Sequence, residues 1–146
     1  MDKTKQPGII NQGIFLKSLT FKIEEENMSN RDYKLDFDYN YMITDEGQGL
    51  FVELSVDVMK NIEKPAFDLK FVLLGIFSVE QDKENMDIKL FAENNAAAIL
   101  MPYAREVISN ITSRTPCPAL IMPPVNVMAV LKNKIPQNAQ DAKVKN

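Results

Sequence analysis

The sequence contains no histidine and a single cysteine, Cys117. One cysteine cannot form a disulfide within the chain, and without histidine a zinc site would lack its usual ligands. Ser109 and Ser113 have no histidine to act as a base, so nucleophilic catalysis has no support. We therefore predict a protein that is not an enzyme and has no metal or cofactor. Cys117, between Pro116 and Pro118, is interpreted as a small packing residue rather than a reactive thiol.

A positively charged field and a long uninterrupted apolar run are also missing. The formal net charge of -3 argues against a nucleic-acid partner. Residues 116–131 carry no charge, but four prolines interrupt them, so we expect no stable membrane insertion. Residues 1–10 contain no apolar core of signal-peptide length, and a cytoplasmic location is the simplest interpretation. With 45% hydrophobic and 25% charged residues, the 146-residue chain is typical of one globular domain.

Alternating apolar and polar residues predict four strands, at 15–24, 33–43, 50–58 and 66–79. Short polar turns join them, which favours an antiparallel meander. The first strand is predicted to point Phe15, Leu19, Phe21 and Ile23 inward, with Lys17 interrupting the series. At Leu73 to Gly75 the alternation slips, which suggests a bulge or a doubly covered edge.

Acidic pairs and glycines within this region have simple structural interpretations. Asp36 and Asp38 are two residues apart, which places them on the solvent face of a strand and not in a catalytic pocket. Gly47 and Gly49 lack the lysine and hydroxyl residue of a phosphate-binding loop and are predicted to form a turn.

A long helix follows, from the alanines at 96–98 to about residue 115. Leu100, Tyr103, Val107 and Ile111 recur at three or four residues and form a predicted apolar stripe, which Ala104 and Ile108 widen. Pro102 should bend the helix or mark where its regular part begins.

Prolines then enforce an extended segment in which Leu120, Ile121 and Met122 can lie across another surface. Residues 125–135 are predicted to form a second, short helix. The prediction is an α+β fold with three parts: a flexible arm at 1–13, a single domain at 14–135 and a flexible tail at 136–146.

One sheet and two modest helices leave apolar surface uncovered, which favours oligomerisation. Methionines and aliphatic residues gather around the proline-rich segment and second helix. They suit a surface that accepts varied apolar sequences, but they can equally be packing under the helix. They are Met101, Ile121, Met122, Val127, Met128, Val130 and Leu131.

The motifs GIFS (75–78), PYARE (102–106) and PVN (124–126) resemble those of the SecB family of protein-export chaperones, and PYARE and PVN stand in the family's order at close to its spacing. The likeness covers roughly residues 14–131. The resemblance implies a homotetramer, a dimer of dimers built from first strands and long helices. The implied interface residues are Phe15, Leu19, Phe21, Leu100, Tyr103, Val107 and Ile111.

The resemblance also implies a function, which is ATP-independent holding of unfolded preproteins in a hydrophobic groove. The implied groove residues are Leu120, Ile121, Met122, Val127, Met128, Val130, Leu131 and Ile135. In the family the client passes to the motor ATPase of the translocase, which docks on an acidic sheet face and the C-terminal segment. Here Ser18, Lys22 and Lys70 stand where acids are expected, and the crossover at 24–32 is short and lacks aromatics. The alternatives are a SecB-like chaperone for one partner such as an antitoxin, and a non-enzymatic protein that binds an apolar ligand.

Overall fold

A computed structural model describes residues 8–44, 46–80 and 87–131 of the chain. Strand β1 (Ile9–Ile23) and a 3-10 turn, η2 (Glu25–Asn27), precede strands β2 (Asp36–Ile43), β3 (Gly49–Asp57) and β4 (Phe67–Val79). Helices α1 (Ile88–Asn94), α2 (Ala96–Thr112) and α3 (Val127–Leu131) follow. The order of strands and helices confirms the predicted α+β fold. Below, residues 24–35 are called the crossover and residues 113–126 the connector.

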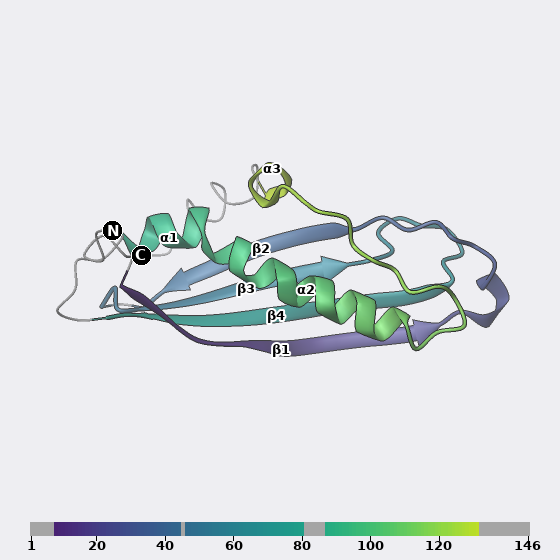
Figure 1. Ribbon diagram of the computed structural model, residues 1–146, viewed down its shortest axis with the longest axis horizontal. Coiled ribbons are helices and arrows are strands. Elements are labelled where there is room, and N and C mark those ends of the chain that lie inside the picture. Colours follow the sequence, from purple (N-terminus) through teal and green to yellow (C-terminus); the bar gives the residue numbers. More distant parts are fainter. Residues whose placement is uncertain (1–7, 45, 81–86, 132–146) are drawn as a thin grey trace.

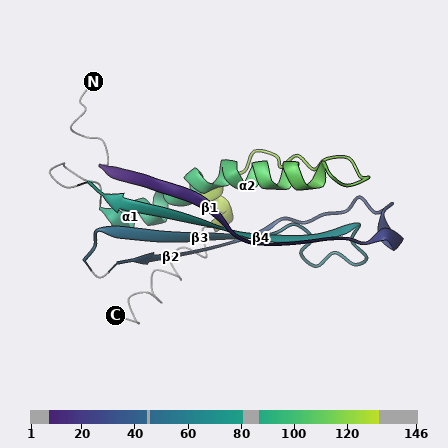
Figure 2. The same cartoon turned by 90° about the horizontal axis from the view of Figure 1, so that it is seen from below.

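The strands form one antiparallel sheet in the order β1-β4-β3-β2, so β1 and β2 are its edges. Helix α2 lies along one face of this sheet, which we call the helix face (Figure 1). Seen from below, the helix is on one side only, and no described helix covers the opposite, outer face (Figure 2). The connector returns from the end of α2 toward β2, where α3 lies (Figure 1).

The predicted alternation decides which side chains reach the core. In β3, Leu50, Val52, Leu54 and Val56 are at most 2% exposed on the helix face. The residues between them lie on the outer face and remain at least partly accessible. Strands β2, β3 and β4 thus each contribute one dry and one wet set, which is the pattern expected when helices cover one side of a sheet.

Gly75 corrects the prediction of a bulge in β4. The strand pairs with β3 without interruption, and its helix-face positions stay buried from Phe67 to Phe77. A Cβ at Gly75 would lie 2.8 Å from Cγ2 of Val52 and 3.0 Å from Cδ1 of Leu100. The apparent slip in the sequence is therefore a glycine on the dry face, where α2 approaches the sheet.

Strand β1 differs most from its prediction. It begins at Ile9, so part of the predicted N-terminal arm is in the sheet. Its register against β4 shifts between Asn11 and Gly13 and again between Leu16 and Ser18, which marks two bulges. Because a bulge inserts one extra residue, the side chains before it change face relative to those after it. The predicted inward position of Phe15 is wrong: Phe15 pairs with Leu74 on the outer face and is 50% exposed.

The buried stripe of α2 lies on the side of the predicted stripe that contains Ala104 and Ile108. Ala97, Leu100, Met101, Ala104 and Ile108 are at most 3% exposed, whereas Tyr103 is 45% exposed. Apolar residues occupy more than one side of this helix, so periodicity alone left two stripes to choose from. The small alanines let α2 approach the sheet at Gly75, and the bulkier tyrosine is turned outward.

Two tyrosines of β2 fasten α1 to the sheet. The Tyr39 hydroxyl donates to the Ala92 carbonyl over 2.6 Å, and the Tyr41 hydroxyl donates to Oε2 of Glu93 over 3.1 Å. Burial raises the pKa of Tyr39 well above its ordinary value, with smaller contributions from Tyr41 and Glu93. Burial also raises the pKa of Tyr41, supported by its hydrogen bond to Glu93.

Several strands and helices are shorter than the sequence predicted. Strand β2 begins at Asp36 rather than Tyr33, and α2 ends at Thr112. Helix α2 continues through Pro102. Within the described residues α3 begins at Val127 rather than residue 125. The predicted tail at 136–146 lies outside the described residues.

Candidate binding surface

The connector is fastened to the end of α2 by a buried threonine. Thr112 is 0% exposed, and its hydroxyl donates to the Ile108 carbonyl over 2.7 Å. The same oxygen accepts the Leu120 backbone N–H over 2.8 Å. Because a buried hydroxyl that both donates and accepts is costly to leave unpaired, this residue fixes where the connector crosses the helix end.

The other side of the connector is tied to the crossover. Arg31 donates through Nη1 to the Met28 carbonyl over 2.6 Å and to Sγ of Cys117 over 3.3 Å. Asn30 donates through Nδ2 to the Lys64 carbonyl over 3.0 Å. Cys117 is half-buried. These contacts hold crossover, connector and the β3–β4 turn together as one rim.

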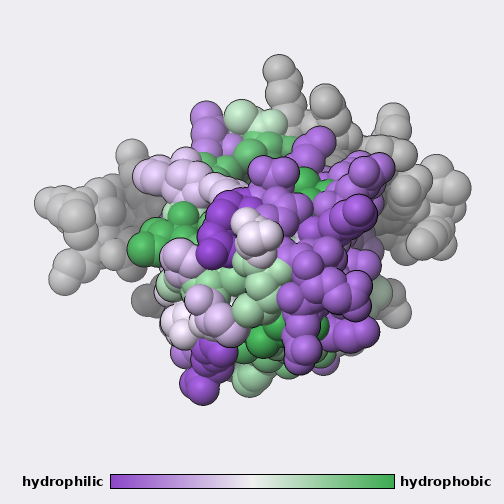
Figure 3. Space-filling model, turned by 90° about the vertical axis from the view of Figure 1, so that its right-hand side faces the viewer, coloured by the Kyte–Doolittle hydropathy of each residue, from purple (hydrophilic) through white to green (hydrophobic). Residues whose placement is uncertain are grey.

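A pocket of about 190 Å³ lies between the crossover and the connector. Its floor is made by buried side chains of the sheet end, and its rim carries the exposed ring of Tyr33. The end of the molecule formed by the crossover is mostly hydrophilic, with apolar areas between the polar side chains (Figure 3). The residues lining the pocket, called here the connector pocket, are Asn30, Arg31, Asp32, Tyr33, Met59, Ala66, Phe67, Cys117, Pro118, Ala119 and Leu120.

Apolar side chains continue from this pocket along the connector to α3. Ile121 is 73% exposed and Val130 is 40% exposed, while Leu120, Val125 and Val127 are half-buried. These five side chains are called here the connector stripe. Each can contact a bound molecule without any change in the chain's own packing.

The remaining predicted groove residues have other positions. Met122 and Leu131 are at most 1% exposed and belong to the core of the chain. They support the connector and α3 from below and are not accessible at the surface. The side chain of Met128, and Ile135, lie outside the described residues.

The predicted interface residues lie in three places: the helix side of the sheet, the core and the outer face. Leu19, Phe21, Val107 and Ile111 are half-buried on the helix side of the sheet, and Tyr103 is exposed there. Thr112 faces the connector, and Tyr103 is turned roughly 180° from it around the helix.

The other two predicted interface residues are elsewhere. Leu100 is 0% exposed in the core. Phe15 is on the outer face, on the far side of the sheet from α2. A helix-side surface can therefore include neither of them.

A second, shallower depression of about 410 Å³ lies on the outer face. Its lining is mixed in charge, and it includes Ser18 and Lys70, two of the positions where the resemblance implies acids. Lys22 is on the same face, two residues beyond Thr20. The lining residues are Ser18, Thr20, Asp36, Asp38, Ser55, Val56, Asp57, Lys60, Lys70, Phe71 and Val72.

Sequence reasoning missed the part of the pocket that the crossover supplies. Tyr33 was assigned to a strand because it continues the alternation of β2, but it lies before that strand and is 43% exposed. An alternating pattern cannot reveal where pairing with the neighbouring strand stops. Arg31 gave no signal, since its partner Cys117 is 86 residues away in the sequence.

Neither a metal centre nor a membrane span emerges from the described ranges. Within 8–44, 46–80 and 87–131, no three histidine, cysteine or acidic side chains are grouped as metal ligands would be. None of the helices in these ranges has the length and apolar character needed to cross a membrane.

The four-stranded sheet, the long helix on one face and the returning connector define the SecB-like class of chaperone folds. A solved structure of this class, the SecB-like chaperone of Mycobacterium tuberculosis in complex with an antitoxin peptide, superposes with a TM-score of 0.64. It is 15% identical and covers 80% of this chain and 90% of that one. A family model described as preprotein translocase subunit SecB matches residues 2–138. The chain belongs to the SecB family.

Related sequences include two protein-export proteins SecB. The one from Anaplasma phagocytophilum is 33% identical over 95 residues, which are 63% of this chain and 60% of the relative. The one from Psychrobacter arcticus is 26% identical over 133 residues, 86% of each chain. An uncharacterized protein of Methanocaldococcus jannaschii is 33% identical over 82 residues, 56% of this chain and 52% of the relative. The match thus spans only half to three-fifths of two of these relatives.

Proposed function

We propose that the protein is an ATP-independent holding chaperone that binds unfolded polypeptides along the connector stripe and the connector pocket. The observation that carries the proposal is the exposure of Ile121 next to an apolar-lined pocket, on a connector fastened by Thr112 and Arg31, with Val130 exposed on the helix that follows. An extended apolar segment of a client can cover the stripe while one of its side chains enters the pocket. Covering apolar surface in this way contributes roughly 25 cal/mol for each Å².

Such contacts are weak individually and need no chemical step for release. Several surfaces in one oligomer would hold a client together, because the first contact raises the effective concentration of the next. When the client folds, its apolar segments become buried and the contacts are lost. Retention of preproteins for export and their delivery to a translocase would be more specific forms of this holding function.

The test uses a slow-folding denatured client and measures how strongly the protein suppresses its aggregation. Ile121→Asp with Val130→Asp should reduce holding by about tenfold or more, because each buried aliphatic side chain contributes about 1.5–3 kcal/mol. Asn126→Asp is the control for an added carboxylate, since it adds one negative charge to the connector without removing an apolar side chain and keeps an oxygen for the Ala129 N–H. Undiminished holding by the double variant would show that the stripe is not the client site.

We further propose a homotetramer in which subunits contact each other on the helix side of the sheet. This subunit interface, called the helix-side surface, contains Leu19, Phe21, Tyr103, Val107 and Ile111. These residues leave apolar surface at the β1 edge and on the flank of α2, where another copy can cover it. Tyr103→Asp should lower the mass measured by light scattering, whereas Glu106→Gln, on the exposed side of α2, should not. Identical masses for both variants and the parent protein would contradict this surface.

A dedicated partner is the second candidate, because the similar structure from Mycobacterium tuberculosis contains an antitoxin peptide. Export delivery has less support from charge, since Lys22 and Lys70 lie on the sheet face where the motor ATPase would dock. Binding of one small apolar ligand is disfavoured by size: about 190 Å³ is below the roughly 300–1,000 Å³ of typical ligand sites. A panel of unrelated unfolded proteins separates these candidates, since a dedicated chaperone would hold only its partner.

A further inference from the structure

The outer face of the sheet has an apolar end. The register places Met42, Phe51 and Ile76 side by side across β2, β3 and β4. In the next row Phe15 lies beside Leu74 across β1 and β4. Met42 is 60% exposed, Phe15 50% and Phe51 36%. We call these five residues the outer apolar patch.

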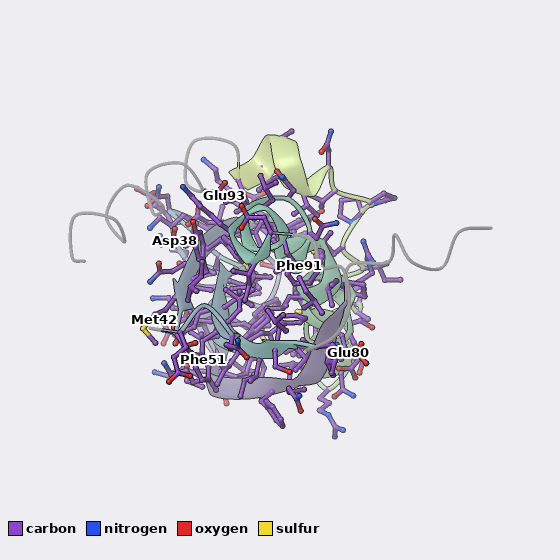
Figure 4. All side chains as sticks on the ribbon, turned by 90° about the vertical axis from the view of Figure 1, so that its left-hand side faces the viewer. Asp38, Met42, Phe51, Glu80, Phe91 and Glu93 are labelled. Carbon is purple, nitrogen blue, oxygen red and sulfur yellow. The ribbon has the colours of Figure 1, made fainter. Side chains whose placement is uncertain are left out.

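The patch is built into the sheet and is not a set of isolated side chains. Gly13, at φ 146°, lacks the Cβ that would lie 2.5 Å from Cζ of Phe15, so the Phe15 ring can approach the glycine closely. In the end view, Met42 and Phe51 lie together on the outer side, while Phe91 lies inside, toward the helices (Figure 4). Monomeric proteins seldom leave a contiguous apolar patch of this kind bare.

The other end of the outer face is charged, with the two signs on different strands. Asp36 and Asp57 lie on β2 and β3, and Lys22 and Lys70 lie on β1 and β4. Asp68 on β4 is an exception to this division. The ion pair between Lys17 and Glu53 spans the middle of the face, next to the apolar patch.

This distribution is self-complementary about one axis. Consider two copies stacked outer face to outer face, with a two-fold axis between them that runs parallel to the strands and in line with the gap between β4 and β3. Rotation about this axis places β1 of one copy over β2 of the other, and β4 over β3. Apolar end then meets apolar end, with Ile76 opposite Phe51, and with Met42 opposite Gly13 and the neighbouring Phe15 ring. At the charged end Lys70 lies opposite Asp57. An axis across the strands would instead place the apolar end on the charged end.

We propose that the outer face binds a second copy of this chain through this two-fold, sheet-on-sheet contact. Two sheets packed face to face keep their strands within about 30° of parallel, which preserves the pairing of both ends. Four strands spaced about 4.8 Å apart, over about 30 Å of paired length, give roughly 600 Å² on each copy. The area buried on both copies together, about 1,200 Å², is at the lower limit for a specific interface, so we expect the contact to form at raised protein concentration.

The contact is independent of the proposed function and of the helix-side surface. It uses the opposite side of the sheet, so both associations can occur in one assembly. At raised concentration the outer-face contact would join two helix-side oligomers. Failure of the holding assay would leave it untouched, and its own failure would leave the chaperone proposal untouched.

Chemical cross-linking tests the axis directly. In a Cys117→Ser background, Ser55→Cys places a thiol about half a strand spacing from the axis, so the two thiols are laterally about 5 Å apart. Asn40→Cys is the matched control on the same face, but on edge strand β2, where the lateral separation is about 14 Å. With the shortest bismaleimide, Ser55→Cys should give a cross-linked dimer whose yield rises with concentration, several-fold above that of Asn40→Cys.

Two changes should abolish this difference. Phe51→Ser removes apolar contact near the axis, and Lys70→Asp places like charges opposite each other. Adding Asp57→Lys to Lys70→Asp restores the pairing and should restore the cross-link. Equal yields at Ser55 and Asn40, no dimer at any concentration, or no response to Phe51→Ser would each overturn the proposal. Circular dichroism of every variant separates loss of contact from loss of fold.

Discussion

Replacing Gly75 by alanine should destabilise the protein, although glycine is ordinarily unfavourable in a strand. Elsewhere in a strand the change would stabilise by about 0.4–1 kcal/mol, because it restricts the unfolded chain. Here the new methyl group would lie 2.8 Å from Cγ2 of Val52, 3.0 Å from Cδ1 of Leu100 and 3.0 Å from Cε2 of Phe77. All three side chains are buried, so none can move aside into solvent.

The magnitude follows from overpacking. Inserting one methyl into a filled core typically costs about 1–3 kcal/mol, which exceeds the gain from the unfolded state. A net loss of about 1–2 kcal/mol corresponds to a melting temperature lowered by roughly 2–8 °C for a chain of this size. Helix α2 would have to shift from the sheet, so the connector attached at Thr112 should move with it.

The assay is a double-mutant cycle followed by urea unfolding. Val52→Ala removes the nearest methyl group, and in that background Gly75→Ala should cost less than in the parent protein, by about 0.5 kcal/mol or more. An alanine variant at Gly75 that is as stable as the parent protein, or more stable, would refute the close approach of α2. Equal costs in both backgrounds would show that Val52 is not the residue that resists the methyl group.

Three further predictions concern polar groups in the core. Tyr39→Phe should lower the unfolding free energy by about 1–3 kcal/mol, measured by chemical denaturation, because the Ala92 carbonyl would lose its partner. The raised pKa values of Tyr39 and Tyr41 stabilise the fold fully below their unfolded value of about 10. This contribution is lost as the pH rises above that value, so the unfolding free energy should fall above pH 10, and it should fall less steeply in Tyr39→Phe. An unfolding free energy that does not change between pH 9 and 11 would contradict this prediction. Thr112→Val should cost about 1–3 kcal/mol and speed proteolysis of the connector, because the Leu120 N–H loses its acceptor; unchanged cleavage would count against that hydrogen bond.

The candidate site could be predicted only in part, and the reason differs from residue to residue. Ile121 and Val130 were expected in the groove and are exposed, but Met122 and Leu131 came with them in the same apolar run and are buried. A run without periodicity does not say which side chains face inward. Tyr33 and the other crossover residues join the connector pocket through contacts across the fold, which local sequence does not encode.

The sequence by itself determined the order of strands and helices, because alternation and helical periodicity are local properties of the chain. It also determined the dry face of β3 and, as far as Leu73, of β4, where the period of two is unbroken. Only the tertiary structure decided the faces of β1 and the buried stripe of α2. A bulge exchanges the two faces of a strand, and a helix apolar on several sides settles on the stripe that packs closest. Both outcomes depend on the neighbour, here β4 for the bulges and Gly75 for the helix.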